Sequence, residues 1–276
     1  MHIKDCYMKE FDESKHPRDD DGKFTDGNNS GKTQWITSKR DYSNVQGIDK
    51  NVLQSDNGND KITKEDFSNE GKDFLDLLNL NVGEHKVGRL QEDLSEQRII
   101  QKVGGGDKTT GSCVSVALCY IANKIGFDTL DFRGGNSQII FANERYSRSF
   151  WDIPQLNTNR QYGITQYEAA SKVFSELESG KEYICCIGSH CSIVRKTQNG
   201  TQYLELQSST QNGWKELDDN VLEERFNVST EPDGYIHQGW CVDVENFKEC
   251  KEFETILGYI NTNVNEQQKG EDGFEK

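Results

Sequence analysis

The sequence predicts an α+β fold in which one helix packs on an antiparallel sheet formed by later segments of the chain. Residues 113–125 carry apolar side chains at helical spacing and follow a stretch rich in glycine, threonine and serine. Residues 182–187, 190–196 and 201–207 are short and either apolar or alternating, as strands are. The last two of these segments are joined through an Asn-Gly pair at 199–200, which is typical of a β-hairpin turn.

The strongly acidic composition restricts the partners that the protein can have. The 276 residues carry a formal net charge of -15, and the sequence pI is about 4.8 with a mean hydropathy of -0.85. Because binding to phosphate groups needs a basic surface, we expect no nucleic-acid partner. No apolar run approaches the roughly 18 residues of a membrane span, and the chain starts without an apolar signal segment. Neither a transmembrane segment nor a signal peptide is therefore expected.

The cysteines predict neither a disulfide framework nor a metal centre. Several of them lie within apolar strand or helix patterns, where a free thiol behaves as a small apolar side chain. The adjacent Cys185 and Cys186, and Cys191 next to His190, lack the spacing of zinc ligands. No cofactor is expected either, because the glycines at 104–106 lack the lysine and the second glycine of a phosphate loop.

Three regions are expected along the chain. Residues 1–63 are rich in Asn, Gly, Asp, Ser and Lys, so they cannot bury enough apolar surface to offset the loss of chain entropy. They are predicted to be a disordered or linker-like tail. Residues 64–262 are predicted to form the folded domain, and residues 263–276 a polar C-terminal tail.

The remaining elements are predicted from apolar spacing and from the residues that end helices and strands. Further helices are expected over 67–78, 87–94, 165–177 and 221–226. Further strands are expected over 98–103, 127–132 and 235–244. Residues 136–163 are rich in aromatic side chains and are expected to be irregular with a short helix, and residues 247–260 are expected to be mixed.

Cys113 is a candidate nucleophile. It lies in the first turn of the predicted central helix, where the partial positive charge of a helix N-terminus favours the thiolate, the reactive form of cysteine. A neighbouring imidazolium would favour the thiolate further. The structural alternative for this residue is a small buried side chain at the start of a helix.

His190 is the candidate base, and the predicted hairpin decides which side chains can reach it. Alternate residues of a strand share a face, so Glu205 and Gln207 lie on one face of the strand that pairs with the strand of His190. A turn at 199–200 places His190 roughly across from 208–209, within reach of Gln207 or Glu205. A nucleophile, a base and an orienting amide or carboxylate can therefore assemble in this order along the chain.

These motifs resemble the layout of papain-fold cysteine peptidases. The matching residues are Gly-Ser-Cys at 111–113, Gly-Ser-His-Cys-Ser-Ile-Val at 188–194, and Tyr-Leu-Glu-Leu-Gln-Ser at 203–208. They look most like the papain-like toxin domains of polymorphic toxins and phage head proteins. The resemblance implies a papain-like fold with Cys113 as nucleophile and His190 as base. It implies Gln207 or Glu205 as the orienting residue, of which Gln207 better fits the Asn position of the family, and Trp214 as the shielding aromatic.

The chain departs from this family at the group that would stabilise an oxyanion. Papain-like peptidases carry a glutamine six residues before the nucleophile, and this chain has Asp107 there. The backbone N–H of Cys113 is expected to contribute instead, together with a side chain from Gln101, Thr109 or Thr110.

A second resemblance concerns the N-terminal tail. The string Ser-Lys-His-Pro-Arg-Asp-Asp-Asp-Gly-Lys-Phe-Thr within residues 12–25 is similar to a segment of bacteriophage minor head (head-morphogenesis) proteins. It implies a phage or prophage product, found in the host cytoplasm or associated with the virion. Phage head components or an immunity protein are then the implied partners.

The patterns together predict a cysteine-dependent hydrolase or deamidase that acts on a protein substrate through a thioester at Cys113. Peptidase, deamidase and transamidase stay open, because the residues define attack at a carbonyl carbon and not the identity of the acyl group. The alternative is a non-catalytic structural or interaction module of a phage head-associated protein, which the missing oxyanion glutamine favours.

Overall fold

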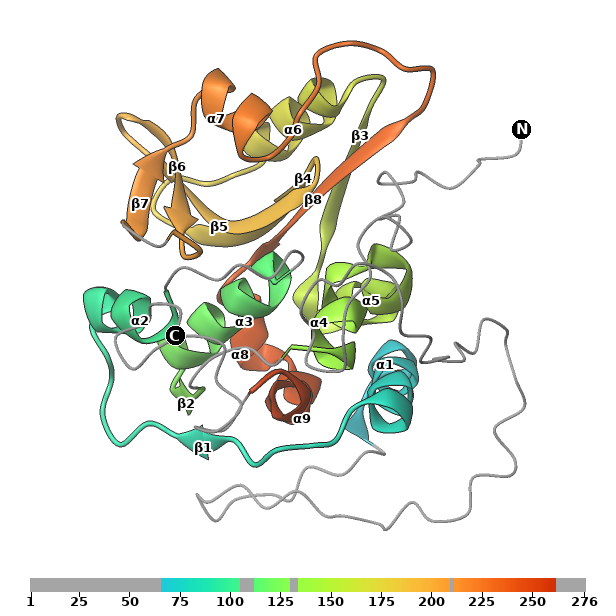
Figure 1. The fold of residues 1–276 in the computed structure, drawn as a ribbon, viewed down its shortest axis with the longest axis vertical. Helices are drawn as coiled ribbons and strands as arrows, with labels where there is room; N and C mark the ends of the chain where they lie inside the picture. The colour runs from blue at the N-terminus through green and yellow to red at the C-terminus, as the bar shows by residue number, and fades with distance from the viewer. Residues whose placement is uncertain (1–65, 105–111, 130–133, 209–210, 262–276) are drawn as a thin grey trace, which may run out of the picture. The chain divides into compact units, whose positions relative to one another are not determined.

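The computed structural model describes residues 66–104, 112–129, 134–208 and 211–261 (Figure 1). The tails expected at 1–63 and 263–276, and with them the phage-like segment at 12–25, lie outside these residues. The helices and strands from Ser68 onward belong to one unit. In the described part of the chain, no helix is both long and apolar enough to cross a membrane.

The described residues form an α+β fold. The helices are α1 (Asn69–Asn81), α2 (Glu96–Val103), α3 (Cys113–Lys124), α4 (Asn136–Ala142), α5 (Glu144–Trp151), the 3-10 helix η3 (Pro154–Leu156), α6 (Gln166–Ser175), α7 (Asp219–Glu224), α8 (Asn246–Glu249) and α9 (Lys251–Ile260). The strands are β1 (Gly88–Arg89), β2 (Phe127–Asp128), β3 (Asn159–Gly163), β4 (Glu182–Ile187), β5 (His190–Thr197), β6 (Gly200–Glu205), β7 (Gly213–Glu216) and β8 (His237–Asp243).

The main sheet has six strands in the order β3-β8-β4-β5-β6-β7, and all neighbouring strands are antiparallel. Strands β4 to β7 follow one another as a meander. Strand β8, the last one in the described part of the chain, lies between β3 and β4 in the interior of the sheet (Figure 1). Strands β1 and β2 form a separate two-stranded pair.

One face of the main sheet is covered by α6 and α7. Alternate strand residues point toward these helices, because successive side chains of a strand lie on opposite faces of the sheet. The buried cluster on this face contains Ala170, Val173 and Leu177 from α6 and the turn after it, Leu222, Phe226 and Val228 from α7 and the segment after it, and Tyr183, Cys185, Ile187, Val194, Tyr203 and Cys241 from the sheet.

Helix α3 packs on the other face, against β5, and also contacts α2, α4 and α9. All ten residues from Val114 to Asn123 are buried. The apolar spacing predicted a helix with one buried face, and the helix itself is confirmed. The structure buries its remaining sides as well, because further helices cover the side that faces away from the sheet.

The strand predicted over 98–103 is wrong, since these residues lie in α2. Ser95 caps this helix through a hydrogen bond from the backbone N–H of Arg98 to its side-chain oxygen, at 3.4 Å. The buried side chains are Ile99, Ile100 and Val103, a spacing that matches one face of a helix. Packing of this face against α3 decides the structure of a segment too short for its periodicity to distinguish helix from strand.

The short helix predicted over 87–94 is also wrong. Gly88 and Arg89 pair with β2, and the Leu90 N–H donates to the carbonyl of Gly126 at 2.9 Å. Strand β7, which the sequence did not predict, extends the sheet beyond β6. The helices predicted over 67–78, 113–125, 165–177 and 221–226 and the strands over 182–187, 190–196, 201–207 and 235–244 are confirmed, with bounds shifted by a few residues.

The hairpin between β5 and β6 is confirmed, but its register differs from the prediction. Thr197 pairs with Gly200, so the turn residues are Gln198 and Asn199, one position earlier than expected. The pairing of Ile193 with Leu204 continues this register. Extended to the first residue of β5, it places His190 opposite Gln207 rather than opposite 208–209.

A buried carboxylate joins the first turn of α9 to the start of α1. Glu252 is 1% exposed, and its Oε1 accepts hydrogen bonds from the N–H and the hydroxyl of Ser68, at 2.7 and 2.9 Å. The Ser68 hydroxyl oxygen in turn accepts from the N–H of Gly71 and so caps α1. A Cβ at Gly71 would lie 2.6 Å from Glu252 Cγ, so the fit requires glycine at this position.

We expect Glu252→Ala to lower the free energy of unfolding by about 2 to 3 kcal/mol, because it removes the acceptor of the partly buried Ser68 N–H and hydroxyl and empties the space that the buried Glu252 side chain fills. Glu254→Ala, in the same helical turn, is the matched control. Its carboxylate pairs with Arg89 at the surface, so its loss should cost less than about 1 kcal/mol. Urea denaturation followed by circular dichroism measures both. Equal losses in the two variants would contradict this assignment.

Candidate active site

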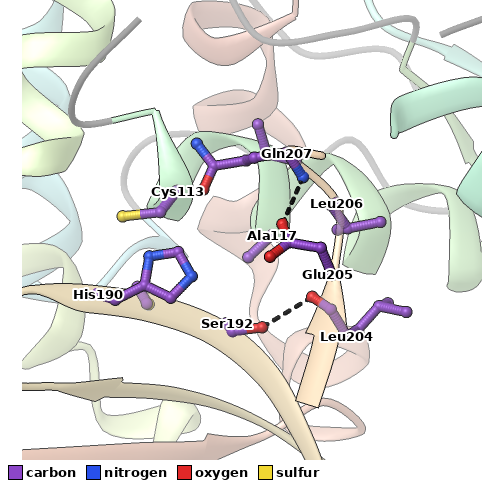
Figure 2. A pocket seen from close by; sticks show the side chains of 10 residues that line it. Cys113, Ala117, His190, Ser192, Leu204, Glu205, Leu206 and Gln207 are labelled. Atoms are coloured by element: carbon purple, nitrogen blue, oxygen red, sulfur yellow. Dashed lines mark hydrogen bonds between the residues drawn. The ribbon is translucent and has the colours of Figure 1, made fainter. Parts of the chain in front are cut away.

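The four residues singled out in the sequence line one cavity. Its volume, including its open mouth, is about 200 Å³. It lies where the first turn of α3 meets the start of β5 and the end of β6 (Figure 2). The lining residues are Cys113, Val116 and Ala117 of α3, His190, Cys191 and Ser192 of β5, and Leu204, Glu205, Leu206 and Gln207 in and after β6.

Cys113 is the first residue of α3 and is partly exposed. Its position places the thiol at the positive end of a helix whose other residues are fixed by burial. Ser112, before it, is fully buried and makes no side-chain cap with the helix. Its hydroxyl instead accepts a hydrogen bond from the Nε2 of Gln207 at 2.8 Å.

His190 begins β5, directly after a two-residue turn. Gly188 in this turn has φ of 59°, and a Cβ there would lie 2.2 Å from the carbonyl oxygen of Phe226. The N–H of Ser189 donates to the same carbonyl at 2.9 Å. The edge contact between the His190 and Phe226 rings, with centroids 4.9 Å apart, completes this packing. Figure 2 shows the His190 ring projecting from β5 toward the first turn of α3, which carries the Cys113 sulfur.

His190 is neutral at physiological pH. Burial disfavours its charged form, and the nearby Arg225 guanidinium acts in the same direction. The Glu205 carboxylate opposes both effects but is outweighed, and the pKa of His190 is lowered to about 3. Its low pKa makes the imidazole a weak base in the free protein, so His190 does not hold Cys113 as a preformed ion pair.

Glu205 is paired with Arg225, a residue that the sequence reasoning did not identify. The Nε of Arg225 donates to Glu205 Oε2 at 2.9 Å and its Nη2 donates to Oε1 at 3.1 Å. Burial favours the neutral acid, but these hydrogen bonds and the guanidinium charge outweigh it and lower the pKa of Glu205. The carboxylate is therefore an ion at neutral pH although its side chain is only 6% exposed.

Gln207 connects three elements of the site. Its backbone N–H donates to Glu205 Oε1 at 2.8 Å. Its side-chain oxygen accepts from Nη2 of Arg225 at 3.0 Å, and its Nε2 donates to Ser112. Among the described residues, no hydrogen bond joins the His190 ring to Gln207 or to Glu205. The structure thus brings both candidate orienting residues to the cavity but directs their oxygens at Arg225.

Trp214 lies on the face of the sheet opposite His190. It pairs with Leu204, which pairs with Ile193, and Ile193 is an odd number of positions from His190 along β5. The Arg195 guanidinium stacks on the Trp214 ring at 3.9 Å.

The aromatic ring that packs against His190 is that of Phe226. The signal in the sequence was the end of the helix predicted over 221–226, but nothing in that pattern indicates which strand the helix end contacts.

Of the residues expected to help stabilise an oxyanion, the structure describes Gln101 and Cys113. Gln101 is exposed on α2 and does not line it. Asp107, Thr109 and Thr110 lie outside the described residues. The backbone N–H of Cys113, at the N-terminus of α3 and beside the cavity, stays the expected donor to an oxyanion.

Cys186 and Cys191 form a disulfide, although the sequence predicted no disulfide framework. The two-residue turn at 188–189 makes Ile187 the partner of His190, so the next pair across the two strands is Cys186 with Cys191. The apolar pattern of the sequence predicted both strands but not the register in which β4 and β5 pair. Cys185 is in turn opposite Cys241 on β8, and both are free thiols.

Among the described residues, no group of three or more His, Cys, Asp or Glu side chains is arranged to hold a metal ion.

Comparisons with family models, with curated proteins and with solved structures find no match to this chain.

The tight fit at Gly188 gives a prediction with a control in the same sheet. Gly180 also has positive φ, at 84°, but a Cβ there meets nothing within 4 Å. Gly180→Ala should therefore cost only the backbone strain, about 1 kcal/mol of unfolding free energy. Gly188→Ala should cost about 3 kcal/mol, because its Cβ also overlaps the Phe226 carbonyl. Chemical denaturation checks this difference, and a Gly188→Ala protein as stable as the Gly180→Ala protein would refute the packing.

The depressed pKa of His190 makes folding sensitive to pH. The folded state resists protonation of His190 down to about pH 3, whereas the unfolded chain takes up this proton near pH 6.5. Stability should therefore fall as pH falls below 6.5, with a slope from this group of at most about 1.4 kcal/mol per pH unit. Above about pH 5.5 the carboxyl of Glu205 is largely ionised in both states and contributes little to the slope, because its pKa is lowered in the folded protein and is ordinary in the unfolded chain.

Urea unfolding of the wild type and of His190→Gln at several pH values between 5.5 and 6.5 measures this slope. The variant should lose stability less steeply with falling pH than the wild type does. Parallel curves for the two proteins would show that His190 titrates normally in the folded state.

Proposed function

We propose that this domain is a papain-like, cysteine-dependent hydrolase or acyl-transfer enzyme that acts on a protein. The observation that carries the proposal is the shared cavity of Cys113, at the start of a buried helix, and His190, at the start of a strand. The end of the neighbouring strand supplies Gln207 to the same cavity. Nucleophile, base and amide occur in the chain order of papain-like enzymes.

The chemistry begins with proton transfer from the Cys113 thiol to the neutral His190 as the sulfur attacks a carbonyl carbon. The helix N-terminus stabilises the negative charge that develops at the sulfur and the oxyanion. The tetrahedral intermediate then collapses to a thioester as its C–N bond breaks, and the imidazolium of His190 gives its proton to the leaving nitrogen. Attack by water on the thioester, with His190 again as base, releases the acid and restores the thiol.

The proposal of a protein substrate rests on the resemblance to papain-like enzymes, whose nucleophile, base and orienting amide occur in the order of Cys113, His190 and Gln207. Peptide cleavage, deamidation and transamidation share the thioester and differ only in what is bound and what attacks it.

A non-catalytic module with a decayed site is the second candidate. One observation favours it, namely that the oxygens of Glu205 and Gln207 bind Arg225 and not His190. The phage-like segment at 12–25 supports a phage or prophage effector in either case, with host proteins, head components or an immunity protein as partners.

The rate of alkylation of Cys113 by iodoacetamide distinguishes the two candidates without a known substrate. An ordinary thiol reacts about tenfold more slowly for each pH unit below its pKa near 8.5. With its pKa lowered to about 3, His190 alone is too weak a base to take the thiol proton between pH 8 and 6, so the catalytic proposal requires that the thiolate formed at Cys113 stabilises the imidazolium. We expect Cys113 to react with a much shallower pH dependence over this range, and His190→Gln to restore the steep one.

Mass spectrometry of the individual cysteine peptides gives these rates, and Cys250 serves as the internal control. Burial raises the pKa of the Cys250 thiol to about 12, so it should remain unmodified. A Cys113 that reacts like an ordinary thiol in both proteins would eliminate the catalytic proposal. Proteomic comparison of host cells expressing wild type or Cys113→Ala then identifies the cleaved or deamidated protein.

A further inference from the structure

We propose that Arg225 is a positioning residue of this site, which fixes the nucleophile's helix through Gln207 and Ser112. The inference rests on the proposed function, because it concerns how Cys113 is held for reaction with His190. Arg225 does not line the cavity, so it acts through the residues that it binds.

The guanidinium of Arg225 binds the two residues at the end of β6 at the same time. Its Nε and Nη2 contact the two oxygens of Glu205, and Nη2 also contacts the side-chain oxygen of Gln207, at 2.9, 3.1 and 3.0 Å. A planar fork with several donors can make this set of bonds, whereas the ammonium group of lysine lacks that geometry. Arg225 directly follows α7. Its backbone N–H donates to the Val221 carbonyl of that helix, which fixes the backbone from which the guanidinium extends.

The side-chain amide of Gln207 connects Arg225 to the residue that precedes α3. With its oxygen held by Arg225, its amide nitrogen is directed at the hydroxyl of Ser112, which it meets at 2.8 Å. Ser112 is completely buried and precedes Cys113. The bonds therefore run from α7 through β6 to the residue before the nucleophile. Figure 2 shows the Gln207 side chain reaching from the end of β6 toward this turn.

The same arrangement explains why an arginine is placed beside a buried base. The groups that face His190 are Glu205 from β6, Arg225 after α7, Cys113 from α3 and the apolar ring of Phe226. An unpaired Glu205 would attract a proton to His190 and remove the base. The charge of Arg225 compensates Glu205, and its geometry positions Gln207.

The test uses a double-mutant cycle on the full-length protein, with Cys113 alkylation at pH 6.5 as the readout. We expect Arg225→Gln and Gln207→Ala each to slow the reaction by about tenfold or more, since small displacements of a reacting group have large effects on rate. Because Arg225 acts through Gln207, the double variant should react no more slowly than Gln207→Ala alone. If the double variant slows the alkylation of Cys113 by the product of the two single effects, the inference is overturned. It is also overturned if Arg225→Gln alone leaves this rate unchanged.

Two further variants test whether Arg225 acts through its geometry or its charge, and whether a slow reaction of Cys113 results from unfolding. Arg225→Lys keeps the charge but loses the fork, so it should remain slow, and full recovery of the rate in this variant would show that charge alone matters. Arg225→Gln leaves the buried Glu205 carboxylate unpaired and can unfold the protein. The pair Arg225→Gln with Glu205→Gln removes both charges and should fold, yet still react slowly. A wild-type rate in this folded double variant also overturns the inference.

Arg195→Gln is the matched control. Arg195 lies on the opposite face of the same sheet with similar exposure of its side chain, 30% against 35% for Arg225. It contacts Gln202, Glu96 and Trp214, none of which lines the cavity. The rate of Cys113 should not change in this variant, and a slowing equal to that of Arg225→Gln would indicate a general loss of sheet stability and overturn the inference.

Loss of the proposed function and loss of this inference give different results. If His190→Gln leaves the rate of Cys113 unchanged, the catalytic pair is refuted. If His190→Gln slows Cys113 and the Arg225 cycle is multiplicative, the catalytic pair stands and only the positioning role of Arg225 is refuted.

Discussion

The burial of α3 on all its sides is the constraint on which the rest of this structure depends. A helix of twelve residues with ten consecutive buried positions cannot be covered by a sheet alone. It requires β5 on one side and α2, α4 and α9 on the others. The helices that surround α3 come from segments before and after the sheet in sequence, so the domain closes around this one element. The start of the helix, where Cys113 lies, is thereby fixed relative to the sheet that carries His190.

Burying polar groups next to this helix carries a cost that the structure meets by pairing. An ionised carboxylate, a guanidinium and an imidazole meet at the end of β6 and the start of β5. The Glu205 and Arg225 charges compensate each other through two hydrogen bonds, and the imidazole stays neutral. A buried ion pair of this kind contributes little net stability compared with apolar side chains. Its retention beside the cavity is more easily understood through the geometry that it imposes on Gln207.

Much of the fold was predictable because long, apolar segments leave few alternatives. The helix over 113–125 and the strands over 182–187 and 190–196 were found nearly at their observed bounds. The segment 98–103 was wrongly predicted to be a strand because six residues do not distinguish helical from strand periodicity. Its packing against α3 makes it a helix. The register of β5 with β6 was displaced because the turn uses Gln198 and Asn199. That small difference moves Gln207 directly across from His190.

The site was predictable only where chain order and local pattern carry the information. Cys113, His190, Glu205 and Gln207 were brought to one cavity, since they follow from a helix start and one hairpin. Arg225 and Phe226 were missed because a helix end does not reveal which strand it will meet. The disulfide was missed for a related reason, because it depends on the register across a two-residue turn and not on cysteine spacing.

The position of β8 has a consequence for how the protein is made. This strand is the last among the described residues, yet it lies between β3 and β4 and pairs with both. A nascent chain on the ribosome can form the β4 to β7 meander, but it cannot join β3 to that meander until residues His237–Asp243 have emerged. The six-stranded sheet that supports His190 is therefore completed only after the residues up to Asp243 have been synthesised.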